Sequence, residues 1–149
     1  MAYNGYLLKI KGVGSGAYSS DYTFPLQYVL ENTFKPIKAI QDKDSYRDGD
    51  GELHRNVVPT KIAKVEFQLR ENLKASEYDV IMSNIANRYT IAAERKCKVD
   101  LYLPETCSYT GYIDVYLPDP EVVIRRIDGN DLIYQSIRMA FIGYGSKNI

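Results

Sequence analysis

The residue types that most often carry out chemistry are scarce in this sequence. His54 is its single histidine, and Cys97 and Cys107 are its two cysteines. One histidine excludes a histidine-rich metal site, and a zinc site would have to recruit thiols from distant positions. No nucleophile motif accompanies His54, and neither cysteine has a local histidine or a helix N-terminus to lower its pKa. The sequence therefore predicts a protein that is not an enzyme, with no catalytic residue, no bound metal and no cofactor.

Residues 42–56 form the most polar stretch of the chain, and its Asp-Gly steps are typical of turns. The spacing resembles that of a calcium loop, because Asp48 and Asp50 fall on the third and fifth positions if Gly51 is taken as the sixth. The first and twelfth positions of such a loop would then lack their carboxylates, and no flanking helices are expected. We therefore expect a protruding, solvated polar hairpin at 42–56 and no calcium site.

A glycine-rich segment, Gly12–Gly16, follows the first expected strand. A phosphate-cradling loop needs a helix that opens directly after the glycines, with its N-terminus aimed at the anion. The residues from Ser19 to Pro25 follow instead and favour irregular or β structure, and no P-loop lysine is present. The segment is interpreted as a flexible loop, with phosphate binding as the alternative.

The two cysteines are not expected to form a disulfide bond. If the apolar faces of the two strands that flank Cys107 match, the residue numbers of each facing pair add up to roughly 214. Cys97 should therefore face Leu117. A disulfide needs Cα atoms within about 7 Å, which this register does not provide. The sequence begins without a basic segment or an apolar signal core, so a reducing cytosol is the expected compartment. No apolar run approaches the roughly 18 residues that span a bilayer, so no membrane partner is expected.

Strict alternation of apolar and polar residues from Lys61 to Arg70 predicts a half-buried antiparallel strand. A helix should follow, because Ser76 and Asp79 have the spacing of a capping box and an apolar stripe recurs at helical spacing. The stripe consists of Tyr78, Ile81, Met82, Ile85 and Tyr89. It could line a cofactor, but packing against a sheet is the favoured interpretation.

Alternation also predicts strands elsewhere in the chain, joined as a meander. They cover residues 6–11, an edge or bulged strand within 24–41, then 96–103, 112–117, 121–127 and one long strand at 132–144. The predicted fold class is mainly β (α+β): an antiparallel β-sandwich or curved barrel of about seven strands, with one flanking α-helix. At 149 residues the chain is expected to be a single domain, 1–149.

Composition bears on partners more than on chemistry. The 19 basic residues balance 19 acidic ones, so there is no positive surplus to attract nucleic acid or anionic lipid. Tyrosine is unusually frequent, with 14 residues, and suits strands and protein interfaces. Outward tyrosines such as Tyr102, Tyr112 and Tyr116 could also stack on bases, which leaves an oligonucleotide-binding barrel as an alternative. We expect protein partners and no sequence-specific nucleic acid.

One combination of segments goes beyond composition: Tyr22–Leu26, Asp44–Asp48, Gly51 with Leu53–Asn56, Thr60–Ile62 and Asp131–Tyr144. Together they resemble a family of small proteins encoded in the tail gene clusters of long-tailed phages and prophages of Gram-positive bacteria. The resemblance extends from about Tyr3 to Tyr144 and is most specific in the Asp-Ser-Tyr-Arg-Asp and Leu-His-Arg-Asn segments. The family has no established activity, so the resemblance implies a setting rather than a mechanism.

With a fold-level analogy to tail-tube subunits and tail-tip rings, the resemblance implies a structural role. We expect a ring-forming component of a phage tail or phage-derived tail particle, at the tail tip or baseplate hub. Its partners would be other copies of itself, in a ring that is hexameric by analogy, and other phage tail proteins. It would reside in the virion tail after assembly in the cytoplasm of the host bacterium. A cytosolic tail-assembly factor is the alternative.

Contacts between subunits are expected from the polar loop 42–56. The residues expected to make them are Asp44, Tyr46, Arg47, Asp48, His54, Arg55 and Asn56. Tyrosine and arginine are common anchors of protein interfaces. Exposed strand edges, which are otherwise an aggregation hazard, would pair with the next copy in a ring.

Overall fold

The computed structural model describes residues 3–14, 16–42, 45–55 and 57–145. It is mainly β with one α-helix and antiparallel strand pairs, which confirms the predicted fold class. The main sheet has seven strands in the order β2-β1-β8-β9-β12-β6-β3. Their bounds are β1 Leu8–Ile10, β2 Tyr22–Thr23, β3 Lys35–Asp42, β6 Val57–Gln68, β8 Lys96–Leu103, β9 Ser108–Tyr116 and β12 Arg138–Gly143.

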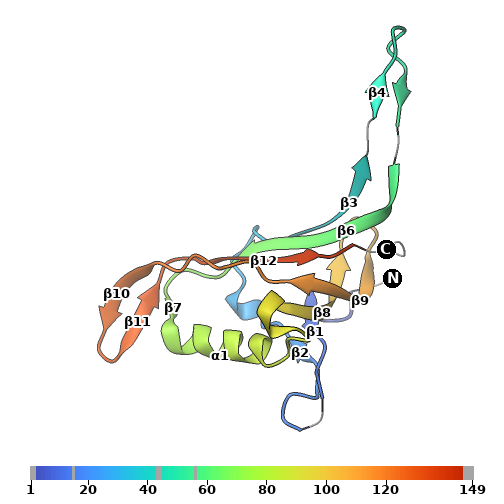
Figure 1. The fold of residues 1–149 in the computed structure, drawn as a ribbon. Helices are drawn as coiled ribbons and strands as arrows, with labels where there is room; N and C mark the ends of the chain where they lie inside the picture. Colours follow the sequence, from blue (N-terminus) through green and yellow to red (C-terminus); the bar gives the residue numbers. More distant parts are fainter. Residues whose placement is uncertain (1–2, 15, 43–44, 56, 146–149) are drawn as a thin grey trace.

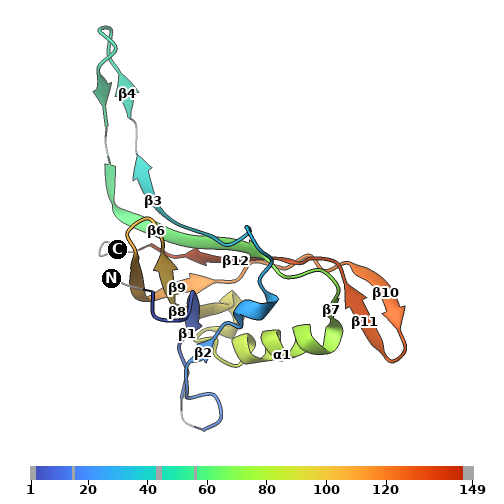
Figure 2. The same cartoon turned by 180° about the vertical axis from the view of Figure 1, so that it is seen from behind.

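Two smaller sheets extend from the main one. β10 (Ile124–Asp128), β11 (Asp131–Tyr134) and β7 (Leu73–Lys74) form a three-stranded sheet, and β4 (Tyr46–Arg47) pairs with β5 (Leu53–His54). Figure 1 shows β4 and β5 at the far end of a long arm that β3 and β6 carry away from the body. The β10–β11 hairpin projects from another side as a second arm (Figures 1 and 2).

The core lies between the main sheet and α1 (Ala75–Ala86), which runs along one face of it (Figure 1). Val65 and Phe67 of β6 are buried, as the alternation predicts. The helical stripe also packs as predicted, because Ile81 and Ile85 are buried and the other stripe residues are partly buried against the core. Sequence periodicity therefore identifies which faces are internal. In the described part of the chain, no helix is both long enough and apolar enough to cross a bilayer.

The start of α1 differs from the prediction that Ser76 and Asp79 form a capping box. The helix begins one residue before Ser76, and the Glu77 carboxylate accepts a hydrogen bond from the Lys74 backbone N–H at 3.2 Å. The Ser76 hydroxyl donates instead to the Asp131 carboxylate at 2.8 Å. The capping prediction was wrong because a tertiary contact with β11 engages the serine that local spacing assigned to the helix.

The expected long strand at 132–144 is divided into β11 and β12. Residues 135–137 connect the small sheet to the main one, and their backbone groups pair with different neighbours. The Gln135 N–H donates to the Val123 carbonyl at 2.9 Å, whereas the Ile137 carbonyl accepts from the Leu69 N–H at 2.8 Å. Both halves keep an apolar inner face, so alternation alone does not reveal the break.

Two other strands are shorter than predicted. Within 24–41, residues Leu26–Tyr28 form a 3-10 helix, and the strand begins only at Lys35. The short helix is closed by a hydrogen bond from the Tyr28 N–H to the carbonyl of the preceding proline at 3.2 Å. The strand expected from residue 121 begins at Ile124.

The register of β8 and β9 places Cys97 opposite Val115, not opposite the predicted Leu117. An extra residue of β9 lies between the partners of Asp100 and Tyr102, and Gly111 takes a positive φ of 73° there. From Lys96 to Asp100 the numbers of paired residues add up to 212 instead of 214, and this even displacement leaves the side chains there on their predicted faces. Beyond Asp100 the bulge changes the register by one further residue. Both cysteines are free thiols.

The two thiols should differ sharply in reactivity. Burial raises the pKa of the Cys97 thiol to about 12, whereas Cys107 is exposed in the turn. Because the thiolate is the nucleophile, iodoacetamide at about pH 8 should alkylate Cys107 alone in the native protein. Both cysteines should react after denaturation. Peptide mass spectrometry reads the result, and native labelling of Cys97 as fast as Cys107 would contradict the burial of that strand face.

Candidate functional site

The expected contact residues that the structure describes gather at the tip of the long arm. In the β4–β5 ladder Tyr46 lies opposite His54, and Arg47 lies opposite Leu53. Tyr46 is 58% exposed and Leu53 is 45% exposed, so the tip presents apolar surface as well as charge. Arg55 is exposed and directly follows β5. Two of the expected residues, Asp44 and Asn56, lie outside the described residues.

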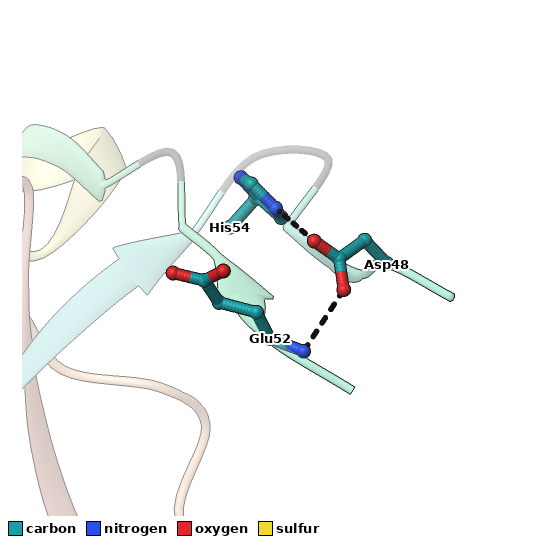
Figure 3. A group of neighbouring side chains, drawn as sticks. All are labelled: Asp48, Glu52 and His54. Atoms are coloured by element: carbon teal, nitrogen blue, oxygen red, sulfur yellow. Dashed lines mark hydrogen bonds and ion pairs between the residues drawn. The ribbon is translucent and has the colours of Figure 1, made fainter. Parts of the chain in front are cut away.

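Asp48 organises the turn between β4 and β5. Its Oδ1 accepts hydrogen bonds from the backbone N–H groups of Asp50 and Glu52, both at 3.0 Å. Its Oδ2 accepts a hydrogen bond from Nε2 of His54 at 2.9 Å (Figure 3). The Tyr46 ring stacks on the His54 ring, with centroids 4.9 Å apart and planes inclined by 15°. One carboxylate therefore joins the turn to both strands.

The Arg47 side chain, from β4, also stabilises the turn between β4 and β5. Its Nη1 donates to the Gly51 carbonyl at 2.9 Å, and the Gly51 N–H donates to the Asp48 carbonyl at 2.9 Å. Gly51 has a φ of 83°, in the left-handed region that favours glycine. Arg47 is therefore partly engaged within its own hairpin.

Asp48, Glu52 and His54 also form a group with the donor types of a metal site. Their ligand atoms all lie within 4.8 Å of one another, and Figure 3 shows the three side chains around the turn. Two carboxylates and an imidazole suit several divalent ions. Both Asp48 oxygens already accept hydrogen bonds from the hairpin, so the observed geometry serves the folding of the tip. The sequence analysis missed this group, although an aspartate followed by Glu and His four and six residues later across an Asp-Gly turn is a usable signal.

The tip should loosen in acid. The hydrogen bond from His54, with smaller contributions from backbone N–H groups, lowers the pKa of the Asp48 carboxyl below 3.8. Because this pKa is lower in the folded hairpin, ionised Asp48 stabilises the tip above pH 3.8, and this stabilisation is lost as the pH falls through the lowered value. In an NMR titration, the amide signals of Asp50 and Glu52 should move with a midpoint below 3.8.

Asp48→Asn should abolish that movement, whereas Asp128→Asn in the other arm should leave it unchanged. A midpoint at or above 3.8 in the unmodified protein would contradict the assigned hydrogen bonds.

A second polar region lies on the outer face of β1, β8 and β9, where tyrosine hydroxyls meet carboxylates. The Tyr6 hydroxyl donates to Asp100 at 2.7 Å, and burial followed by this bond raises the pKa of Tyr6 to about 12. The Tyr112 hydroxyl donates to Asp21, and the Tyr109 hydroxyl donates to the Tyr6 carbonyl at 2.8 Å. Carboxylates at a stacking face repel phosphate, so these contacts favour a structural role for the tyrosines over base stacking.

The glycine segment adopts a compact loop in the part that the structure describes. The Gly12 N–H donates to the Asp21 carboxylate at 3.0 Å, so this backbone donor faces an anion of the protein itself. A Cβ on Gly12 would lie 2.2 Å from the Ser19 carbonyl oxygen, and this close approach explains the glycine. The α-helix of a phosphate loop does not follow in residues 16–25. The geometry agrees with the loop interpretation rather than with a phosphate site.

A buried arginine that the sequence analysis missed holds this loop against α1. Arg88 is only 4% exposed, and its Nε donates to the Ser20 carbonyl at 3.0 Å. Its Nη1 donates to the Asn84 carbonyl at the end of the helix at 2.8 Å. The guanidinium also lies 5.4 Å and 5.3 Å from the ring centroids of Tyr18 and Tyr22. Arg88 therefore acts in the fold, and its signal in the sequence is weak because its partners are carbonyls and rings.

Comparison with solved structures finds distant likenesses to chains of gene transfer agent particles. The chain is similar to a chain from the tail of an empty gene transfer agent particle refined with C6 symmetry, at 16% identity and a TM-score of 0.48. It is also similar to a chain from the virion of a native gene transfer agent particle, at 13% identity and a TM-score of 0.49. Each match covers 97% of this chain and 96% of the other. Such low identities and TM-scores assign no function.

Comparison with curated proteins finds no match. A family model matches residues 1–144, almost the whole sequence, and its description is a family of unknown function, DUF6711. The match includes both arms, the helix and the main sheet. The chain therefore belongs to the DUF6711 family.

Proposed function

We propose that this protein is a non-enzymatic structural component of a phage tail or phage-derived tail particle. In this proposal it acts as a single domain, 1–149, that forms a ring with other copies at the tail tip or baseplate hub. The loop 42–56 contacts a neighbouring subunit, and the ring is a hexamer. The resemblance of several sequence segments to tail-cluster proteins of long-tailed phages supports this setting.

The observation that carries the proposal is the arm formed by β3 and β6. It lifts the β4–β5 tip clear of the body (Figures 1 and 2), and the tip has internal hydrogen bonds that fix its shape. A tip with exposed Tyr46 and Leu53 costs little entropy to dock, because its internal hydrogen bonds set its conformation before binding. Among the described residues, those of the β4–β5 tip contribute no side chain to the buried core cluster, whereas the base of the arm contributes Val65 and Phe67 of β6. An exposed tip of this kind is suited to contact another molecule.

Open sheet edges give a second line of support. β2 and β3 are the outer strands of the main sheet, and β10 is an outer strand of the small one. Outer strands present unpaired backbone groups that soluble monomers usually protect. Closed assembly of many copies covers such edges, whereas an isolated copy leaves them open.

Mass spectrometry of purified particles tests the proposal. A structural component should be present in stoichiometric copies, in a multiple of six per particle if the ring is hexameric. A protein found in infected cells but missing from finished particles would refute the structural role and favour the alternative, a cytosolic tail-assembly factor. Light scattering over a concentration series adds an independent test, because ring formation predicts a closed multimer of the 17.0 kDa chain.

A further inference from the structure

The second arm carries a concentrated group of exposed apolar side chains. All five residues of β10 are exposed, and four apolar residues within 122–127 are more than one-third exposed. These are Val122 at 37%, Val123 at 45%, Ile124 at 54% and Ile127 at 76%. β10 pairs with β11 on one side only, so its other edge is open. An apolar strand with an open edge marks an interaction surface.

The same strand carries a small positive surplus. β10 contains Arg125 and Arg126 against one carboxylate, Asp128, at its end beside the turn. Arg125 donates to the Asn72 side-chain carbonyl at 3.3 Å, and neither arginine makes an ion pair within the described part of the chain. The β10 edge therefore offers apolar side chains beside two guanidinium groups, and the partner that fits it is acidic with apolar anchors.

The tip of the long arm, residues 45–55, offers carboxylates and apolar anchors. It carries three carboxylates, Asp48, Asp50 and Glu52, against two arginines, Arg47 and Arg55, so its charge is weakly negative. Its exposed apolar side chains are Tyr46 and Leu53. Asp48 is occupied by the turn, but the Asp50 and Glu52 carboxylates accept no hydrogen bond from the described residues. Two carboxylates of the tip are thus available to pair with two arginines.

The two surfaces cannot meet within one molecule. Figures 1 and 2 show the arms leaving the body in different directions, with the tip far from β10 in both views. Pairing of β10 with β10 of another copy is disfavoured, because a symmetric antiparallel pair brings Arg125 and Arg126 of both copies together. A head-to-tail contact between different surfaces avoids that repulsion and can be repeated around a ring.

We infer that the weakly acidic tip of one copy, with Tyr46 and Leu53 as anchors, docks on the β10 edge of a second copy at Arg125 and Arg126. This inference rests on the proposed function and adds the receiving surface. It makes the contact directional, since each copy provides one tip and accepts one tip. It also makes association salt-sensitive, because the charges lie at exposed positions where ions screen them.

Neutralising each surface separately tests the inference. One variant carries Arg125→Gln and Arg126→Gln, and the other carries Asp50→Asn and Glu52→Gln. Each should self-associate about tenfold more weakly than the wild-type chain in light scattering at low salt. An equimolar mixture should form a complex of only two chains, because the first variant keeps its tip and the second keeps its β10 edge. A matched control, Glu31→Gln with Glu105→Gln, removes two charges elsewhere and should associate like the wild type.

Charge reversal gives the complementary test. Arg125→Glu with Arg126→Glu should abolish self-association, and addition of Asp50→Lys and Glu52→Lys to the same chain should restore it. Association that survives both neutralised variants overturns the inference, and so does a wild-type chain that stays monomeric at every concentration and salt level. Particle composition tests the proposed function separately. If the protein is present in stoichiometric copies but the charge-reversed chain does not regain self-association, only this contact is refuted. If the protein is absent from particles, the structural role itself is refuted.

Discussion

Phe67→Ala should lower the free energy of unfolding by about 3–5 kcal/mol, the cost expected for truncating a buried phenylalanine. Phe67 is 1% exposed, and its ring centroid lies 5.1 Å from that of Phe24, 5.4 Å from that of Phe34 and 6.4 Å from that of Phe141. Truncation removes its contacts with three rings at once and leaves a cavity between β6, β12 and the N-terminal segment. Urea denaturation followed by circular dichroism measures the loss.

Tyr46→Ala provides the matched control for this prediction. Tyr46 is an aromatic residue on the same hairpin system, but it is exposed at the tip, where its ring stacks on that of His54. Its truncation should change the free energy of unfolding by no more than about 0.5 kcal/mol. Equal losses in the two variants would mean that β6 does not carry the centre of the core.

Tyr46→Ser combined with Leu53→Ser should reduce the copies of this protein in finished particles by at least about tenfold, while the isolated protein still folds. The two side chains are the exposed apolar groups of the tip, and neither belongs to the core cluster. The ladder between β4 and β5 uses backbone groups, so the hairpin should keep its shape. Quantitative mass spectrometry of particles made with the variant gene gives the copy number.

The control for the tip variant is Val80→Ser with Ile91→Ser, which alters two exposed apolar residues outside both arms. This control should enter particles at the wild-type level. Normal incorporation of the tip variant would show that these anchors are dispensable, and an unfolded tip variant would show that the hairpin supports the fold. Melting curves of both variants separate these results.

A variant of Arg47 alone would not test the contact surface cleanly. Arg47 donates to the Gly51 carbonyl, so its removal alters the turn as well as the surface. The β10 arginines and the Asp50 and Glu52 carboxylates are better probes, since the turn does not depend on their side chains. A contact residue and a positioning residue can thus lie side by side on one hairpin.

Local patterns in the sequence determined much of the architecture. Alternation from Lys61 to Arg70 identifies the buried face of β6, and spacing of 3 and 4 residues identifies the face of α1 that packs on the core. These patterns are informative because one face of each element is buried. Apolar side chains therefore recur at about every turn of a helix and at every second residue of a strand. The polar composition of 42–56 likewise predicts an exposed segment, since its side chains gain little from a core.

Only the tertiary structure decided how the segments meet. The β8–β9 register differs from the predicted one and changes again at a bulge beside Gly111, Ser76 at the start of α1 is engaged by Asp131, and the break before β12 depends on which sheet each half joins. At the tip, the turn brings Asp48, Glu52 and His54 together, and across the molecule the two arms point apart. Apart from the tip, whose three residues lie within six positions of one another, these outcomes rest on contacts between segments separated in the chain. Such contacts exist only after folding, so periodicity cannot specify them.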